Sequence, residues 1–388
     1  MADSKIRVCR DENMIRLGDV ATYINGYAFK PEDRGEEGLP IIRIQDLTGN
    51  AHDLGFYNGE YPKKVEINDG DILISWSASL GVYIWSEGKA LLNQHIFKVV
   101  FDKVAIDKNY FVYAVRRKLV EMGMKTHGAT MKHIVKKDFD ATLIPYPTLD
   151  KQAEIAVNLN KVSSIIEARE QELQLLDNLI KARFVEMFGD PVMNEKGWIT
   201  KSLLDMGRCK NGMNFHYDDE GVEINCLGVG DFKELSIIDN TDELPTVSLK
   251  EMPSEEYLLK DDDIVFVRSN GNKALVGRSI AVYPGNVPTT FSGFCIRYRK
   301  HDNEIIVPYL LRALKADSMR MKMTGRGANI QNLNQQILGT LVIPVPPIEL
   351  QNQFADFVKQ VDKSKVKVQK ALDETQKLFD SLMQQYFG

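Results

Sequence analysis

Cysteine and histidine are scarce in this sequence, and neither is arranged as a set of metal ligands. The four cysteines are far apart and form no CxxC pair, and the six histidines show no zinc-finger spacing. These absences predict no structural metal and no disulfide framework, and they favour a reduced compartment such as the cytoplasm. With 44% hydrophobic and 27% charged residues among 388, the composition is that of an ordinary globular protein of two or three domains.

Long apolar segments and catalytic motifs are also missing. No apolar run approaches the roughly 18 residues of a membrane span, and the first residues lack the apolar stretch of a secretory signal. No GxxxxGK[ST] loop is present, so a nucleotide-driven motor is not expected. Gly228 and Gly230 resemble part of a dinucleotide-binding loop, but Phe232 and Lys233 occupy the place of its third glycine, which favours a plain turn. We therefore expect no catalytic residues, metal or cofactor in this chain.

Charge is distributed in blocks along the chain. The net charge of −5, taken as an average, argues against nucleic acid as a partner. Residues 218–263 carry fifteen acidic and three basic residues, whereas residues 268–300 carry six basic residues and no acidic one. Residues 112–137 form a second basic block, with seven basic residues against Glu121. Such blocks can attract phosphate even on an acidic protein, although solvated surface charge is the alternative explanation.

The chain is an internal repeat. Ile-Pro-Tyr-Pro at residues 144–147 returns as Ile-Pro-Val-Pro at residues 343–346, an offset of 199, and Gly26 returns as Gly212 at an offset of 186. An offset that grows in small steps along the chain indicates two duplicated halves with different loop lengths.

Each half ends in a segment with a heptad repeat. The first segment has one series at Leu159, Ile166, Leu173, Ile180 and Met187 and a companion series at Ile155, Val162 and Leu176. The second segment has Val358, Leu372, Phe379 and Tyr386 with Phe354, Val361, Val368 and Leu382. Neither contains glycine or proline before its terminal Phe-Gly, so two long helices are predicted. Matched seams favour an intramolecular coiled coil, and helices that each cover only their own domain are the alternative.

The segments before these helices combine strands with helices. Short β-branched and aromatic runs at residues 71–76, 96–101 and 264–267 indicate strands, and basic helical stretches follow near residues 110–124 and 307–323. The expected fold class is α+β, with two similar globular domains that are each followed by a long helix.

Two variable domains, each followed by a proline-rich turn and a heptad helix, resemble the specificity (S) subunit of type I restriction–modification enzymes. The family pattern I-P-x-P-P-x-x-x-Q is complete at residues 343–351, whereas the first copy has Thr148 in place of the second proline. Leu-Gly-Asp-Val at residues 17–20, the stretch from Trp198 to Gly212 and residues 92–99 are also similar to segments of the family's target-recognition domains.

The resemblance implies a non-catalytic DNA reader. Each recognition domain would read one half of a bipartite target on double-stranded DNA, while the two helices pack antiparallel as a spacer. Two modification subunits carrying S-adenosylmethionine, and two restriction subunits using ATP and Mg, would be the partners. The implied domains are 1–147 and 191–346 for target recognition, with spacer helices in 148–190 and 347–388.

Candidate DNA-contacting residues are those whose side chains can bond to base edges or phosphates. In the first domain they are Arg43, Gln45, Ser75, Trp76, Asn93, Gln94, His95, Lys125, Thr130 and Lys132. In the second domain they are Asn211, Arg268, Ser269, Asn270, Asn272, Lys273, Arg278, Arg326, Asn329 and Gln331. Ordinary surface loops are the alternative for any one of them.

Three other functions are compatible with parts of the pattern. A stand-alone bipartite DNA-binding regulator would need useful affinity without partner subunits. A fused methyltransferase or nuclease is disfavoured by the missing motifs. A structural scaffold, in which the basic blocks are incidental, would lack the steeply salt-dependent DNA binding of a reader.

Overall fold

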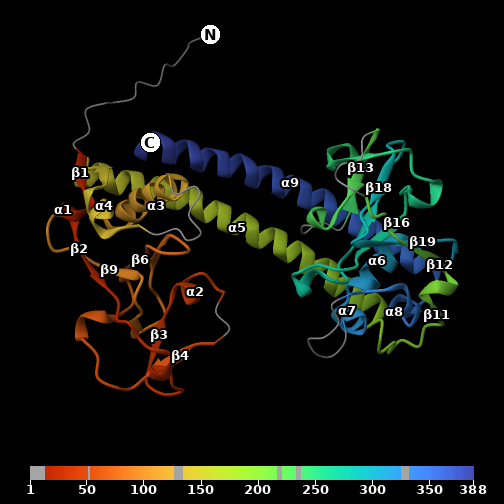
Figure 1. Ribbon diagram of the computed structural model, residues 1–388, viewed down its shortest axis with the longest axis horizontal. Coiled ribbons are helices and arrows are strands. Elements are labelled where there is room, and N and C mark those ends of the chain that lie inside the picture. The colour runs from red at the N-terminus through yellow and green to blue at the C-terminus, as the bar shows by residue number, and fades with distance from the viewer. Residues whose placement is uncertain (1–13, 51–52, 126–133, 216–220, 233–236, 325–331) are drawn as a thin grey trace, which may run out of the picture. The chain divides into compact units, whose positions relative to one another are not determined.

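The computed structural model describes residues 14–50, 53–125, 134–215, 221–232, 237–324 and 332–388 (Figure 1). The chain divides into two compact units. Unit 1 comprises residues 1–170 and 370–388, and unit 2 comprises residues 171–369. Each unit therefore contains one globular part and one end of each of the two long helices.

Two sheets form the globular part of unit 1. One has the strand order β2-β9-β6-β7 and is antiparallel throughout. The other has the order β4-β3-β8-β5, in which β3 and β8 run parallel, and β1 forms a separate ribbon with β10. The strands are β1 (Met14–Arg16), β2 (Thr22–Asn25), β3 (Leu39–Ile42), β4 (Gly55–Tyr57), β5 (Glu66–Ile67), β6 (Ile72–Ser75), β7 (Gly81–Ile84), β8 (Ala90–Leu92), β9 (Ile96–Val100) and β10 (Leu143–Pro145).

Unit 2 repeats this plan. Its larger sheet has the order β12-β19-β16-β17-β14, and the first four of these strands correspond in order to β2, β9, β6 and β7. The β15-β13-β18 sheet again contains a parallel pair, β13 with β18, and β11 forms a ribbon with β20. The strands are β11 (Thr200–Ser202), β12 (Gly207–Asn211), β13 (Val222–Leu227), β14 (Ile237–Ile238), β15 (Thr246–Leu249), β16 (Asp263–Val267), β17 (Ser279–Val282), β18 (Thr289–Phe291), β19 (Cys295–Lys300) and β20 (Val342–Pro344).

The longer helices follow the strands in each repeat, so the predicted α+β class is confirmed. The helix expected near residues 110–124 is α3, whereas the one expected near residues 307–323 is split, because Ala316 adopts an extended backbone between α6 and α7. Among the described helices, none is long and apolar enough to cross a membrane. The helices are α1 (Leu17–Val20), α2 (Ile44–Leu47), α3 (Lys108–Lys125), α4 (Lys136–Ala141), α5 (Leu149–Phe188), α6 (Val307–Lys315), α7 (Asp317–Thr324), α8 (Gln335–Gly339) and α9 (Ile348–Phe387).

The central strands are apolar on both faces because the sheets that contain β6 and β16 are covered on both sides. In β6, Ile72 and Ile74 pack with Phe111 of α3, while Leu73 packs with Trp85 in a second core shared with the other sheet. Strand β16 of unit 2 divides its side chains between two cores in the same way. Burying each such side chain contributes about 1.5–3 kcal/mol, so these strands anchor the loops at their ends.

Helices α5 and α9 pack antiparallel, as the heptads predict. In unit 1 the beginning of α5 shares a core with the end of α9, and in unit 2 the end of α5 shares a core with the beginning of α9. In unit 1 the Arg169 guanidinium donates to the Thr375 hydroxyl and to the Ala371 carbonyl. In unit 2 Lys365 pairs with Asp177 at 2.6 Å. Polar pairs of this kind fix the register of a coiled coil.

Each long helix ends in the core of the other repeat. Phe188, the last residue of α5, packs against Tyr309 of the second repeat at a ring-centroid distance of 4.8 Å. Phe387, the last residue of α9, packs against Tyr110 of the first repeat at 5.1 Å. Both Phe-Gly ends found in the sequence are therefore anchors that the two repeats exchange.

A buried glutamine fixes the start of each long helix. Gln152 accepts a hydrogen bond from the Asp107 amide at 2.9 Å and donates to the Pro147 carbonyl at 2.8 Å. Gln351 makes the same two bonds, from the Ile306 amide at 3.0 Å and to the Pro346 carbonyl at 2.8 Å. The glutamine of the repeated motif thus ties the proline-rich turn to the segment before α3 or α6.

Replacing Gln351 by alanine is expected to destabilise unit 2 by about 2–3 kcal/mol, because buried backbone groups lose their hydrogen-bond partner. The change is measured as a lower midpoint of urea unfolding. Gln353→Ala is the matched control, because Gln353 is a glutamine of the same helix with an exposed side chain. This variant should leave the midpoint unchanged. Equal midpoints for the two variants would show that these bonds contribute nothing to stability.

Candidate nucleic-acid interface

Three loops meet at one end of the antiparallel sheet in unit 1. They are the residues after β2, the residues after β6 and the turn between β8 and β9. Six backbone hydrogen bonds join them to one another and to neighbouring segments: Gly26 to Ile96, Tyr27 to Leu92, Asn93 to Ile42, Gln94 to Tyr27, Trp76 to His95 and Ile134 to Trp76, written from amide to carbonyl. Such bonding holds the loops in one backbone arrangement whatever side chains they carry.

The same six bonds recur in unit 2. They join Gly212 to Cys295, Met213 to Phe291, Ser292 to Leu227, Gly293 to Met213, Arg268 to Phe294 and Leu333 to Arg268, again from amide to carbonyl. Trp76 and Arg268 therefore occupy equivalent positions, and so do His95 and Phe294. The two repeats share a loop scaffold and differ in the side chains that it carries.

Several predicted residues come together on the scaffold of unit 1. The Trp76 indole donates to the Asn25 side chain at 3.3 Å and stands edge-on to the His95 ring at 5.0 Å. His95 has a left-handed backbone with φ of 73°, a strained conformation that concentrates at functional sites. Gln94 beside it is exposed, and Asn93 is half-buried. These residues form a polar and aromatic surface that can bond to base edges.

In unit 2 the predicted residues follow β16. The Arg268 guanidinium donates to the Gly293 carbonyl at 3.2 Å, and Ser269 pairs with Asn332 in an isolated bridge. The side chains of Asn270 and Asn272 each accept a backbone amide two residues further on, at 2.7 and 3.0 Å. These local bonds shape the loop between β16 and β17. Arg278 precedes β17 and is half-buried, and the Asn211 side chain accepts a hydrogen bond from Gln335 at 3.2 Å.

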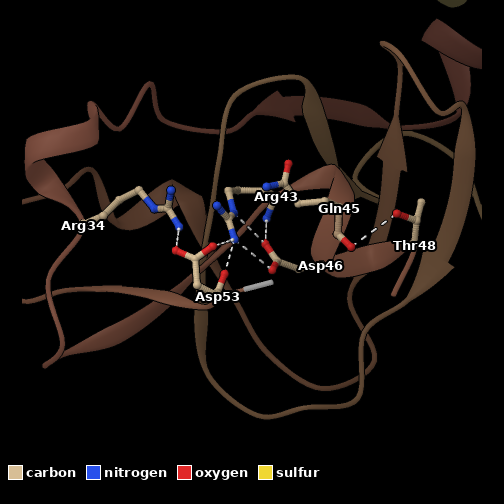
Figure 2. Close-up of polar contacts among 6 residues, drawn as sticks. All are labelled: Arg34, Arg43, Gln45, Asp46, Thr48 and Asp53. Carbon is tan, nitrogen blue, oxygen red and sulfur yellow. Dashed lines mark hydrogen bonds and ion pairs between the residues drawn. The ribbon is translucent and has the colours of Figure 1, made fainter. Parts of the chain in front are cut away.

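Arg43 and Gln45 lie at the start of α2, directly after β3, whose Ile42 carbonyl accepts a hydrogen bond from the Asn93 amide. Figure 2 shows the polar contacts around Arg43. The Arg43 guanidinium contacts Asp46 at 3.0 Å and Asp53 at 3.7 Å. Hydrogen bonding to Asp46, together with the nearby negative charges, raises the pKa of Arg43. Gln45 is exposed and its side chain lies at the surface. Arg43 thus stabilises the loop that presents Gln45.

The Gly228 segment occupies the corresponding place in unit 2. Its amide donates to the Asp231 carboxylate at 2.8 Å, as the Arg43 amide donates to Asp46 at 2.7 Å. Residues Val229–Asp231 form a 3-10 turn, in agreement with the turn expected at this position from the sequence.

The structure describes some of the remaining candidates fully, some only in their backbone and some not at all. Ser75 is fully buried, and its hydroxyl donates to the Ser79 carbonyl at 2.6 Å, so it supports the turn after β6 from inside. The backbones of Lys125 and Lys273 lie at the end of α3 and in a 3-10 turn, but their side chains are outside the described part of the chain. The candidates that lie wholly outside the described residues are Thr130, Lys132, Arg326, Asn329 and Gln331.

Two side chains at this surface were not among the sequence candidates. Asn25 bonds to Trp76, and its position directly before the repeated Gly26 was the signal that could have identified it. Phe294 follows Gly293 in the turn before β19 and is 61% exposed. The constant offset of 199 between the C-terminal parts of the repeats pairs it with His95, although the two residue types differ.

Comparison with known proteins identifies the family. The model of the type I restriction modification DNA specificity domain matches residues 10–178 and 195–375. The chain belongs to this type I specificity family. Its role is therefore the recognition of DNA sequence.

Individual members of the type I specificity family resemble nearly the whole chain. The specificity subunit of the restriction enzyme EcoBI from Escherichia coli is 25% identical over 412 residues, which cover 96% of this chain and 85% of that protein. The MjaVIII specificity subunit of Methanocaldococcus jannaschii is 23% identical, with coverage of 92% and 87%. These relatives are specificity subunits of restriction enzymes and give no support to the alternative of a stand-alone regulator.

Solved structures show the same fold. The type I S subunit from M. genitalium has a TM-score of 0.54 at 17% identity and covers 99% of this chain and 98% of its own. A chain from a study of complex assembly and conformational transition in a type I system has a TM-score of 0.56 at 14% identity, with 98% of each chain covered. A specificity protein of this family has a non-catalytic role, which agrees with the expectation from the sequence.

Gly212→Ala is expected to displace the three bonded loops of unit 2 and to destabilise that unit by about 1–3 kcal/mol. A Cβ atom at this position would lie 2.1 Å from the Ser292 carbonyl oxygen, and at Gly26 it would lie 2.0 Å from the Asn93 oxygen. Urea unfolding measures the effect. Gly230→Ala, where a Cβ atom meets no atom within 4 Å, is the control. If Gly212→Ala unfolded at the same urea concentration as Gly230→Ala, the close packing of these loops would not matter to the fold.

Proposed function

We propose that each repeat reads one half of a bipartite DNA target as part of a type I restriction–modification complex. The observation that carries this proposal is the shared loop scaffold, in which six equivalent hydrogen bonds support different side chains in the two repeats. One repeat presents Trp76, Gln94 and His95, and the other presents Arg268, Ser269 and Phe294. Identical scaffolds with different side chains suit two half-sites of different sequence.

The long helices would set the distance between the half-sites and bind the partner subunits. Each has 40 residues, which corresponds to about 60 Å at 1.5 Å per residue. The proposed domains are 1–147 and 191–346 for recognition and 148–190 and 347–388 for the spacer. The compact units cut across this division because each contains one end of both helices.

The catalytic activities would belong to other subunits in the cytoplasm. Two modification subunits would carry S-adenosylmethionine and methylate adenine, and two restriction subunits would use ATP and Mg. The resemblance between the halves of this chain supports two copies of each partner, because equivalent surfaces recur in the two repeats.

The proposal is tested by co-expressing the chain with the modification subunit encoded beside it and mapping adenine methylation across the host genome. A split motif with a fixed gap is the expected result. A soluble, co-purifying complex that methylates no such motif would contradict bipartite reading.

Removing matched heptads from both helices is expected to shorten the gap between the half-sites. Arg169 faces Thr375 and Asp177 faces Lys365, so deletion of residues 170–176 together with residues 366–372 preserves the helix register. The lost length of about 10.5 Å corresponds to roughly three base pairs. The methylation map of the variant complex measures the new gap.

Two controls accompany the heptad deletion. Deleting residues 170–176 alone leaves the two helices unequal in length and should abolish assembly of the complex, because the Arg169–Thr375 and Asp177–Lys365 pairs can then no longer form together. Exchanging the exposed Glu172 and Lys367 for alanine should leave the gap as it is in the unmodified chain. An unaltered gap after the matched deletion would show that the helices do not set the distance between the half-sites.

Exchanging Arg268, Asn270 and Lys273 for alanine is expected to alter recognition of one half-site only. A lost base contact weakens binding roughly 5- to 150-fold, and removing two cations lowers the salt dependence of binding. Titration of the complex with duplexes that carry changes in either half-site measures both effects. Lys363→Ala, at an exposed position of α9, is the control. Altered recognition of both half-sites would show that the repeats do not read DNA independently.

A further inference from the structure

The turn between β18 and β19 exposes a phenylalanine beside the polar residues Arg268 and Ser269. Phe294 is 61% exposed, whereas Phe291, three residues earlier, is fully buried. Among the described residues it is the one phenylalanine with an exposed side chain. A single exposed apolar residue is common on protein surfaces, so its meaning depends on where it lies.

The backbone around Phe294 is firmly held. Its carbonyl accepts hydrogen bonds from the Arg268 amide at 2.8 Å and from the Ser269 amide at 3.4 Å. Its own amide donates to the Ser292 hydroxyl at 3.3 Å. The preceding Gly293 is bonded through its amide to Met213 at 2.6 Å and through its carbonyl to the Arg268 guanidinium. The ring therefore projects from a fixed position within the predicted recognition loops.

The equivalent position in unit 1 also carries an aromatic ring. The His95 carbonyl accepts a hydrogen bond from the Trp76 amide, just as the Phe294 carbonyl accepts one from the Arg268 amide. The His95 ring rests against Trp76, and its Nδ1 atom is buried without a hydrogen-bond partner in the described part of the chain. Two loops with otherwise different sequences thus place an aromatic side chain at the same point of the scaffold.

The chemistry of a phenyl ring restricts what it can contact on DNA. It has no charge and no donor, so it gains nothing from phosphates, which bind basic and hydrogen-bonding groups. It can pack on a thymine methyl group or against the face of a base at an opened step. Arg268 and Ser269, held against the same turn, supply the polar contacts beside it.

We propose that Phe294 is a base-contacting residue of the second recognition domain and contributes affinity for its half-site through its ring. This inference rests on the proposed function, because it assumes that the loops of unit 2 face DNA. It adds an apolar contact, at a position that His95 occupies in the first domain, to the polar residues predicted from the sequence.

The test uses the complex with the modification subunit and a duplex that carries the methylated motif found in the genome map. Phe294→Ala is expected to weaken binding roughly 5- to 100-fold, in the range of aromatic contacts with bases. Phe294→Leu, which keeps apolar area, should lose less. Because the ring is uncharged, the slope of log affinity against log salt should not change. Ile199→Ala removes another exposed apolar side chain of unit 2, 78% exposed, and serves as the control.

A second duplex, with the half-site of unit 2 replaced by unrelated sequence, completes the experiment. The proposal requires that Phe294→Ala and the unmodified chain bind this duplex equally. Equal affinity of both proteins for the intact target overturns it, and so does the same loss of affinity on both duplexes. The unmodified chain tests the proposed function separately. If its complex does not bind the intact target more tightly than the second duplex, the proposed function itself is contradicted, whatever the Phe294→Ala variant does.

Discussion

The structure depends on the exchange of helix ends between the two repeats. Helix α5 begins in the core of the first repeat and ends with Phe188 against Tyr309 of the second, while α9 ends with Phe387 against Tyr110 of the first. Each core is therefore incomplete without a segment from the other repeat. A large aromatic side chain buried in this way contributes several kcal/mol, so neither unit is expected to be stable when the chain is cut between the repeats.

A short series of contacts links the end of each long helix to the start of the other. Tyr110 and Tyr309, which receive the exchanged phenylalanines, donate their hydroxyls to the carbonyls of Pro145 and Pro344 at 2.9 Å in both cases. Those prolines end the strands β10 and β20, which precede the long helices. Gln152 and Gln351 then fix the first turns. Because all of these groups are buried and paired, the start of each long helix is fixed to the strand that precedes it.

The sequence predicted the features that depend on period and order, namely the repeat, the α+β class and the paired heptad helices. It did not anticipate how nearby side chains pair and pack once the loops have folded. Ser75 is a polar residue that the sequence places beside Trp76, yet its hydroxyl bonds inside the turn. Arg43 looks like a free cation until Asp46 and Asp53 are seen to surround it. The helix after β19 is split at Ala316, a residue with high helix propensity, because tertiary packing overrides propensity.

The loops show why recognition residues are hard to find in a single sequence. Backbone hydrogen bonds fix the position of each loop, and a backbone bond places no demand on the side chain of the residue that makes it. Gly26 and Gly212 are the exceptions, because a Cβ atom there would collide with the carbonyl of Asn93 or Ser292. A repeated glycine therefore marks the scaffold, whereas the backbone bonds at His95 and Phe294 place no demand on the side chain, and the residue types there differ between the repeats. Similarity between the repeats therefore locates the loop scaffold, and a position where equivalent backbone bonds carry different residue types is one that the fold leaves free to vary.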